Sequence, residues 1–181
     1  MPAEDGEIWW FAPDPRAVLL LDALHVSRSL RRVLPRFDVT VDTAFRDVIA
    51  GCSNRGEGDW IDERITAVYT ELHELGFAHS VEVWTREPRR LAGGLYGIAL
   101  GGLFAAESKF HVVRDASKVA VVALVELLRA GGDAGDRLLD AQWLTPHLAS
   151  LGFVEISRDE YQARLERALE LPLPPSFAKS S

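Results

Sequence analysis

The stretch that decides the fold is GGLYGIALGGLFAAESKFHVVRDASK, residues 93–118. It predicts two apolar strands joined by a turn at Gly101–Gly102, followed by a helix that begins at Asp115. Glu107 lies in the second of these strands, between two phenylalanines. An ionised carboxylate is costly in so apolar a strand unless a cation pairs with it, so Glu107 is a candidate functional residue. A structural ion pair with Lys109 or another cation is the alternative, and spacing alone leaves both open.

Composition sets broad bounds on the class of protein. With 181 residues, 48% of them hydrophobic, the chain can form one compact domain with a real core. The net charge of −7 argues against nonspecific nucleic-acid binding over the whole surface, although it leaves room for a local basic patch. A single cysteine, Cys52, excludes an internal disulfide. The longest apolar run, Val119–Leu128, is too short to span a membrane, and the acidic N-terminus does not resemble a signal peptide. We expect a cytoplasmic protein.

Hydrophobic periodicity predicts helices and strands along the rest of the chain. The expected helices are Leu24–Leu34, Thr43–Gly51, Asp62–Leu75, Pro146–Leu151 and Arg158–Leu171, and the further strands are Asp38–Val41, His79–Trp84, Arg137–Gln142 and Phe153–Ile156. This order predicts an α/β fold with a mixed, mostly antiparallel sheet flanked by helices. The layout resembles the acetyltransferase-like arrangement of the GNAT fold, but topology alone does not give chemistry.

Few sets of side chains suggest chemistry. The five histidines show no ligand spacing and there is no cysteine cluster, so we expect no metal. Arg28, Arg31 and Arg32 share one face of a predicted helix; this is a candidate phosphate contact, although an ordinary solvated face is the more common explanation. Asp140 and Gln142 lie two residues apart in a predicted strand, where period two places them on one face. Together with Glu107, this pair suits binding and positioning rather than a covalent intermediate.

Several motifs together resemble one family. In chain order they are WWFAPDPRAV, LHVSRSLRR, GDWI, LHELGFAHSVEVW, LAGGLYGIALGGLFAAESKF, DASKVA, LLDAQWLTPHLASLG and VEISRDEY, from Trp9 to Tyr161. This combination is similar to the leucyl/phenylalanyl-tRNA–protein transferases. The resemblance implies a GNAT-like enzyme that uses no cofactor. It would move leucine or phenylalanine from leucyl-tRNA or phenylalanyl-tRNA to the α-amine of acceptor proteins with N-terminal Arg or Lys, which marks them for degradation by the N-end rule.

The resemblance also implies roles for individual residues. Gln142 would accept a hydrogen bond from the attacking amine, Asp140 would polarise the Gln142 amide, and Glu107 would bind the cationic side chain of the acceptor. The remaining implied roles are a donor side-chain pocket formed by Trp60, Leu95, Phe104 and Leu139, an adenosine contact at Tyr69, and a tRNA-binding helix face formed by Arg28, Arg31 and Arg32.

The chain departs from the family pattern at a few points. By this resemblance we expect the chain to lack most of the family's N-terminal domain, with an arm at residues 1–22 as its remnant, a catalytic domain at 23–171 and a disordered tail at 172–181. Ala106 replaces a usual glycine, and Lys109 stands where methionine is usual, close enough in sequence to compete for Glu107. Two alternatives stay open: a GNAT-type acyl-CoA N-acyltransferase with a pyrophosphate at the helix opened by Asp115, and a non-catalytic relative that binds tRNA or protein N-termini.

Overall fold

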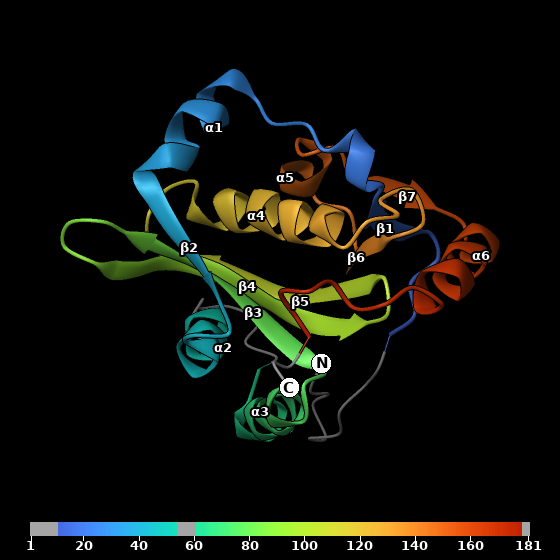
Figure 1. Cartoon of the computed structure of the whole chain (residues 1–181), viewed down its shortest axis with the longest axis horizontal. Coiled ribbons are helices and arrows are strands. Elements are labelled where there is room, and N and C mark those ends of the chain that lie inside the picture. The colour runs from blue at the N-terminus through green and yellow to red at the C-terminus, as the bar shows by residue number, and fades with distance from the viewer. Residues whose placement is uncertain (1–10, 54–60, 179–181) are drawn as a thin grey trace.

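A single mixed sheet organises the protein. The computed structural model describes residues 11–53 and 61–178. Its seven strands have the order β2-β3-β4-β5-β6-β1-β7, and helices cover both faces (Figure 1). The strands are β1 (Arg16–Leu19), β2 (Phe37–Val41), β3 (Ala78–Thr85), β4 (Arg90–Leu100), β5 (Leu103–His111), β6 (Leu138–Gln142) and β7 (Val154–Ile156). Only β5 and β6 run parallel; the other neighbours are antiparallel. The predicted α/β class with a mixed, mostly antiparallel sheet is therefore confirmed.

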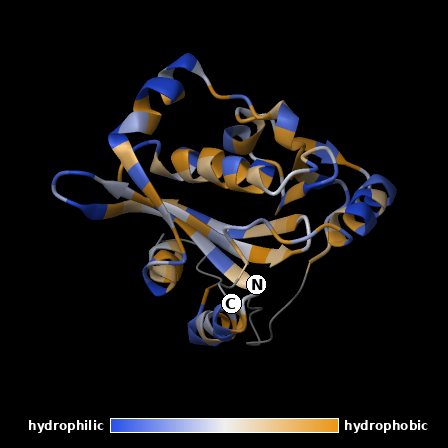
Figure 2. Cartoon of the chain, in the orientation of Figure 1, coloured by the Kyte–Doolittle hydropathy of each residue, from blue (hydrophilic) through white to orange (hydrophobic). Residues whose placement is uncertain are grey.

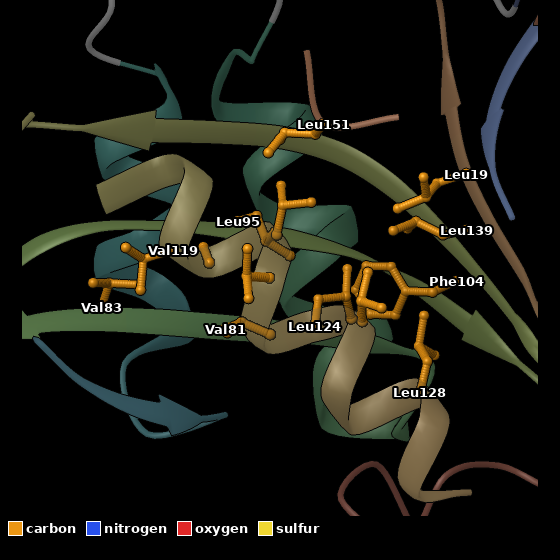
Figure 3. Close-up of a cluster of buried hydrophobic side chains, with 14 of the residues drawn as sticks. Leu19, Val81, Val83, Leu95, Phe104, Val119, Leu124, Leu128, Leu139 and Leu151 are labelled. Carbon is orange, nitrogen blue, oxygen red and sulfur yellow. The ribbon is translucent and has the colours of Figure 1, made fainter. Parts of the chain in front are cut away.

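Helices on the two faces bury two separate cores. The helices are α1 (Arg28–Val33), α2 (Phe45–Ser53), α3 (Glu63–Leu75), α4 (Ala116–Ala130), α5 (Pro146–Ala149) and α6 (Arg158–Leu169), with short 3-10 turns η1 (Leu21–Ala23) and η2 (Leu34–Arg36). The largely apolar α4 covers one face, and α2 and α3 cover the other (Figures 1 and 2). Val81, Val83 and Leu95 pack under α4 (Figure 3), whereas Tyr69 and Tyr96 belong to the opposite core.

The chain's turns and caps have local causes. The Asp62 side chain accepts a hydrogen bond from the Ile65 backbone N–H at 3.0 Å, which begins α3, and Gly76 ends that helix in the left-handed region at φ 86°. Gly101, at φ 57°, makes the turn between β4 and β5, where a side chain would meet the backbone oxygens of Ala168 and Leu169 at the end of α6 and of Leu171. The predicted hairpin and the predicted ends of α3 are confirmed.

Two expected boundaries differ from the structure. The run from Arg16 to Leu19 is not part of a peripheral arm, because as β1 it lies inside the sheet between β6 and β7. The expected disordered tail is ordered over residues 172–178: the carbonyl of Pro172 accepts hydrogen bonds from Arg137 at 3.1 Å, and Phe177 is 2% exposed. The Phe177 ring packs against His79 and Phe104, so apolar burial holds this segment on the sheet.

Candidate active site

The candidate site begins where β5 and β6 separate. Their parallel pairing covers only residues Leu103–Ala105 of β5. From Ala106 onward, β5 has β4 as its only strand neighbour within the described ranges. A strand edge that is released in this way leaves backbone groups and side chains accessible to a ligand.

Two irregular pairings lie at this point of separation. Tyr96 opposes Ser108 while Gly97 opposes Ala106, so Glu107 is an extra residue without a partner on β4. In the same way Ala17 opposes Gln142 while Val18 opposes Asp140, which leaves Ala141 as the extra residue of β6. Such β-bulges turn side chains out of the regular alternation and are frequent beside active sites.

Asp140 is the centre of a buried ionic network. Its carboxylate is fully buried and accepts hydrogen bonds from Arg16, the shortest from Nη2 at 2.6 Å. The Tyr161 hydroxyl donates to the same carboxylate at 3.0 Å, and the Arg16 guanidinium stacks on the Tyr161 ring with 4.6 Å to its centroid. Burial alone would lower the pKa of Arg16, but the hydrogen bond and charge of Asp140 raise it above its usual value. Arg16 is therefore a permanent cation inside the site.

Gln142 is held by this network through its backbone. Its N–H donates to Asp140 Oδ1 at 2.9 Å, and its φ of 60° lies in the left-handed region, which is uncommon for a glutamine. In the orientation that suits both ends of its amide, Nε2 lies 3.0 Å from the Ala106 carbonyl oxygen and 3.1 Å from that of Ala141. The amide thus spans from β6 to the peptide bond that precedes Glu107.

The sequence prediction about Asp140 and Gln142 needs correction. Period two places the two side chains on one face, but the bulge makes them oppose the successive residues Val18 and Ala17, so simple alternation does not hold. The contact between them is also different from the expected one. Asp140 accepts from the Gln142 backbone N–H, whereas the prediction had it polarise the side-chain amide.

Glu107 faces the α3 side of the sheet. The Tyr69 hydroxyl donates a hydrogen bond to its carboxylate, and Asp140 and Arg16 lie close enough to act on it electrostatically. Burial raises the pKa of Glu107; the Tyr69 hydrogen bond and Arg16 oppose this shift, and the negative charge of Asp140 adds to it. Burial, followed by the charge of Glu107, also raises the pKa of Tyr69. This carboxylate is therefore partly desolvated, and a cationic ligand would be favoured beside it.

Lys109 does not share this environment. The bulge at Glu107 shifts the alternation of β5, so that Lys109 opposes Leu95, which packs under α4, and Ser108 opposes Tyr96, which packs against α3. Lys109 thus lies on the α4 side and Glu107 on the α3 side. The expectation that Lys109 competes for Glu107 rests on regular alternation and is not supported by this geometry.

Three residues of the expected donor pocket lie together. Leu95, Phe104 and Leu139 are each no more than 1% exposed, and they pack in one cluster with Leu124 and Leu128 of α4 (Figure 3). The fourth, Trp60, lies outside the described residues, as do Trp9 and Trp10 of the expected arm. The structure thus places three of the four predicted pocket residues in one apolar layer beneath α4.

The remaining predicted residues are placed as follows. Arg28, Arg31 and Arg32 are exposed on α1, away from the pairing of β5 with β6. Tyr69 is only 3% exposed, and its ring packs edge-to-face on Tyr96 with 5.1 Å between centroids. Tyr69 thus contacts Glu107 from a buried position, and its expected contact with the terminal adenosine stays a prediction.

Sequence reasoning missed Arg16 and Tyr161 as members of the site. Arg16 and Asp140 are 124 positions apart, so no local pattern joins them. The available signal was that Arg16 and Tyr161 both fall within motifs that resemble the family, WWFAPDPRAV and VEISRDEY.

In the part of the chain that the structure describes, no helix is long and apolar enough to cross a membrane. Over the same residues, no group of three or more His, Cys, Asp or Glu side chains could hold a metal ion.

Comparisons with known proteins agree on one family. The family model for leucyl/phenylalanyl-tRNA protein transferase matches residues 18–166. A leucyl/phenylalanyl-tRNA–protein transferase of Herpetosiphon aurantiacus is 52% identical over 92% of this chain and 86% of its own length. That of Phenylobacterium zucineum is 51% identical over 93% of this chain and 76% of its own. A structure of a conserved protein of unknown function from Bacteroides thetaiotaomicron is 12% identical with a TM-score of 0.46, which supports no assignment.

Proposed function

Because this chain belongs to the leucyl/phenylalanyl-tRNA protein transferase family and so transfers leucine or phenylalanine from aminoacyl-tRNA to protein N-termini, we propose that the transfer takes place where β5 and β6 separate. The observation that carries this proposal is the Gln142 amide, which reaches from β6 to the Ala106 carbonyl immediately before Glu107. This contact supports the proposal because Gln142, the proposed hydrogen-bond acceptor for the attacking amine, then lies beside the peptide bond that precedes Glu107, the proposed binder of the cationic side chain.

The reaction itself is the aminolysis of an ester. The α-amine nitrogen of the acceptor attacks the ester carbonyl carbon, the bond from that carbon to the ribose oxygen breaks, and a proton from the amine passes to the departing oxygen. An α-amine has a pKa of about 8, so a useful fraction is neutral near pH 7. An activated ester mainly requires that this amine be held in line. The Gln142 side-chain oxygen is the acceptor that orients the amine N–H in this proposal.

Asp140, Arg16 and Tyr161 act as positioning residues. Asp140 fixes the Gln142 backbone in its left-handed conformation, which a glutamine adopts only when its surroundings impose it. Arg16 and Tyr161 hold Asp140 from the other side. This replaces the expected polarisation of the Gln142 amide by Asp140, and it predicts that the network determines geometry rather than proton transfer.

Glu107 is proposed as the residue that recognises an N-terminal Arg or Lys of the acceptor. Its carboxylate accepts a hydrogen bond from Tyr69 and lies close enough to the Arg16–Asp140 pair to be affected by both charges. A guanidinium or ammonium at Glu107 would form a charge-assisted contact in a partly dry site. Because the cationic side chain and the α-amine belong to one residue, a single acceptor residue can satisfy both Glu107 and Gln142.

The donor side chain is proposed to enter the apolar layer of Leu95, Phe104 and Leu139. Since these residues are almost fully buried, the layer must open to admit a leucyl or phenylalanyl group. Such a site distinguishes donors by size, at about 1–3 kcal/mol per missing methylene. Trp60 is kept as a proposed member of this pocket, and the exposed arginines of α1 as the proposed tRNA-binding surface.

Two broader expectations are also kept as proposals. The catalytic unit would span residues 23–171 together with β1 and the packed segment 172–178, since both belong to the same sheet and core. The reaction would take place in the cytoplasm, where charged tRNA is used, and the GNAT fold remains the proposed fold type.

A transfer assay tests this function. The purified chain should move labelled leucine or phenylalanine from charged tRNA onto a peptide that begins with Arg. Gln142→Ala should lose the rate, and Glu107→Ala should lose the preference for Arg or Lys at the acceptor N-terminus. If both variants transfer at the wild-type rate and with the wild-type preference, the site assignment is wrong; if the wild-type chain transfers nothing, the function itself is not supported.

A further inference from the structure

A pocket lies at the end of β5, beyond the candidate site. It has a volume of about 560 Å³ and is lined by residues 109–112 at the end of β5, Gly51 of α2, Ser117 of α4 and His147 of α5. These elements come from both sides of the sheet, so the pocket sits at the released edge of β5. The transfer mechanism described above uses none of its residues.

Basic side chains converge on this pocket. Lys109, His111 and His147 line it, and Lys118 of α4 is near enough to act on His147. Burial and then the neighbouring Lys109 and Lys118 lower the pKa of His147, while Asp115 opposes this shift. The Asp115 carboxylate oxygens lie 3.8 Å from Lys118 Nζ and 3.8 Å from Arg114 Nε. Lys109 and Lys118 therefore outnumber the one carboxylate that acts on His147, which makes the surroundings of the pocket electropositive.

Two polar groups accompany this charge. The His147 Nε2 atom is buried and has no hydrogen-bond partner among the described residues. An imidazole nitrogen in that position is left unsatisfied unless a ligand or water contacts it. The Ser117 hydroxyl lies 3.4 Å from His111 Nδ1, in the same wall of the pocket. Lysine, imidazole and hydroxyl groups around one hollow suit an oxyanion such as a phosphate.

We propose that this pocket binds a backbone phosphate at the 3′ end of the donor tRNA. The inference rests on the proposed function and adds a subsite to it. Lys109 opposes Leu95 across the β4–β5 pair, and Leu95 belongs to the layer proposed for the donor side chain. Glu107, proposed for the acceptor, faces the other side of the sheet. Although Gly51 of α2 also lines the pocket, Lys109 and Ser117 lie on the α4 side, so the basic wall of the pocket adjoins the donor side.

The spacing along β5 agrees with this assignment. Two residues of a strand span about 7 Å, which places Lys109 roughly one nucleotide's length from Glu107 and the reacting ester. A phosphate that precedes the terminal adenosine would then reach Lys109 and His147 while the ester stays beside Gln142. An acidic segment of the acceptor protein is the competing occupant, and it would have to cross from the Glu107 side to the α4 side of β5.

A pair of minimal donors isolates the phosphate contact. One is the 3′-phenylalanyl ester of adenosine; the other is the same ester of adenosine 5′-monophosphate. We expect the wild-type chain to prefer the phosphate-bearing donor in kcat/KM and to lose that preference as salt rises. Lys109→Gln should lower the ratio of the two kcat/KM values about tenfold, the loss expected for one hydrogen bond to a charged group. His147→Ala should lower the same ratio.

The control variant is Arg46→Gln, which removes a positive charge from an exposed pair with Glu74. It should keep the wild-type ratio. A ratio that Lys109→Gln leaves unchanged would overturn the inference, and so would an equal fall for both donors or a loss confined to acidic acceptor peptides. If the wild-type chain transfers from no donor, calorimetry with adenosine 5′-monophosphate and adenosine still decides: tighter binding of the phosphate form that Lys109→Gln abolishes supports the pocket, and equal binding rejects it.

Discussion

The Arg16–Asp140 pair gives the most detailed prediction. Asp140→Asn keeps the volume of the side chain but leaves the Arg16 guanidinium without its counter-charge in a site where the two side chains are 18% and 0% exposed. Breaking a buried pair by removing one partner typically costs 3–5 kcal/mol. Because Arg16 keeps some solvent contact and the Tyr161 ring, we expect the lower part of this range, about 3 kcal/mol. For a chain of this length that corresponds to a fall in Tm of roughly 6–12 °C.

A double-mutant cycle separates this pair from its surroundings. Arg16→Met should destabilise the chain by a similar amount because it leaves the Asp140 charge unpaired. The variant with both substitutions should lose less than the sum of the two, by about 2 kcal/mol, since no unpaired charge remains. The assay is urea unfolding of all four proteins at pH 7. Additive losses would refute the view that the two residues form one coupled network.

Activity should not follow stability in this cycle. Asp140 also fixes the Gln142 N–H at 2.9 Å, and the double variant does not restore that charged acceptor. A misplacement of about 1 Å near the reacting atoms can lower kcat by about a hundredfold. We therefore expect Asp140→Asn and the double variant to be similarly slow in transfer, with a small change in donor KM. Recovery of kcat in the double variant would show that Asp140 acts only through stability.

Three further predictions follow from single contacts. Burial raises the pKa of Glu107, so the folded chain disfavours its charged form. The protonated carboxyl group therefore contributes stability below about pH 4, and this contribution is lost as the pH rises through the raised pKa. Glu107→Gln should then raise the Tm at pH 7, by roughly 2–4 °C for each kcal/mol regained, and the gain should shrink toward pH 4; a lower Tm at pH 7 would contradict the sign. Tyr69→Phe removes the hydrogen bond that lowers the Glu107 pKa, so Glu107 should become protonated at a higher pH. As the pH is lowered, KM for an Arg peptide should therefore begin to rise at a higher pH than in the wild type, and an unchanged pH profile would rule out the contact. Gly97→Ala would place a Cβ against the Ala105 carbonyl and 2.5 Å from the Phe104 ring, which should cost about 1–3 kcal/mol in urea unfolding. Gly135→Ala, with nothing within 4 Å of its added Cβ, is the control, and equal losses in the two variants would reject the packing argument.

The local parts of the fold were predictable from sequence because their causes are local. Asp62 accepts from the N–H of Ile65, three residues on, and the Gly76 N–H bonds to carbonyls three and four residues back, so both ends of α3 follow from local contacts. The Gly101–Gly102 turn similarly determines the central hairpin. β1 was missed as a strand because it has only four residues, one of them Arg16, which is too few to show a period.

The site was only partly predictable because its geometry depends on strand register. Glu107, Asp140 and Gln142 were singled out as unusual polar residues in apolar strands, and the structure brings them to neighbouring positions. Their side-chain directions depend on two bulges, which no spacing in the sequence reports. The role of Arg16 depends on a contact between distant segments, so it became visible only in the folded sheet.

The central claim is that Glu107 binds the positively charged N-terminal side chain of the acceptor while Gln142 orients the α-amine of the same residue. It is tested most directly by kcat/KM for two peptides that differ only at the N-terminal residue, arginine or its uncharged analogue citrulline, with wild type and Glu107→Gln. We predict that the preference of the wild type for arginine falls about thirtyfold in the variant, as expected for a charge-assisted contact of about 2 kcal/mol. An arginine preference that is the same in both proteins would contradict the account.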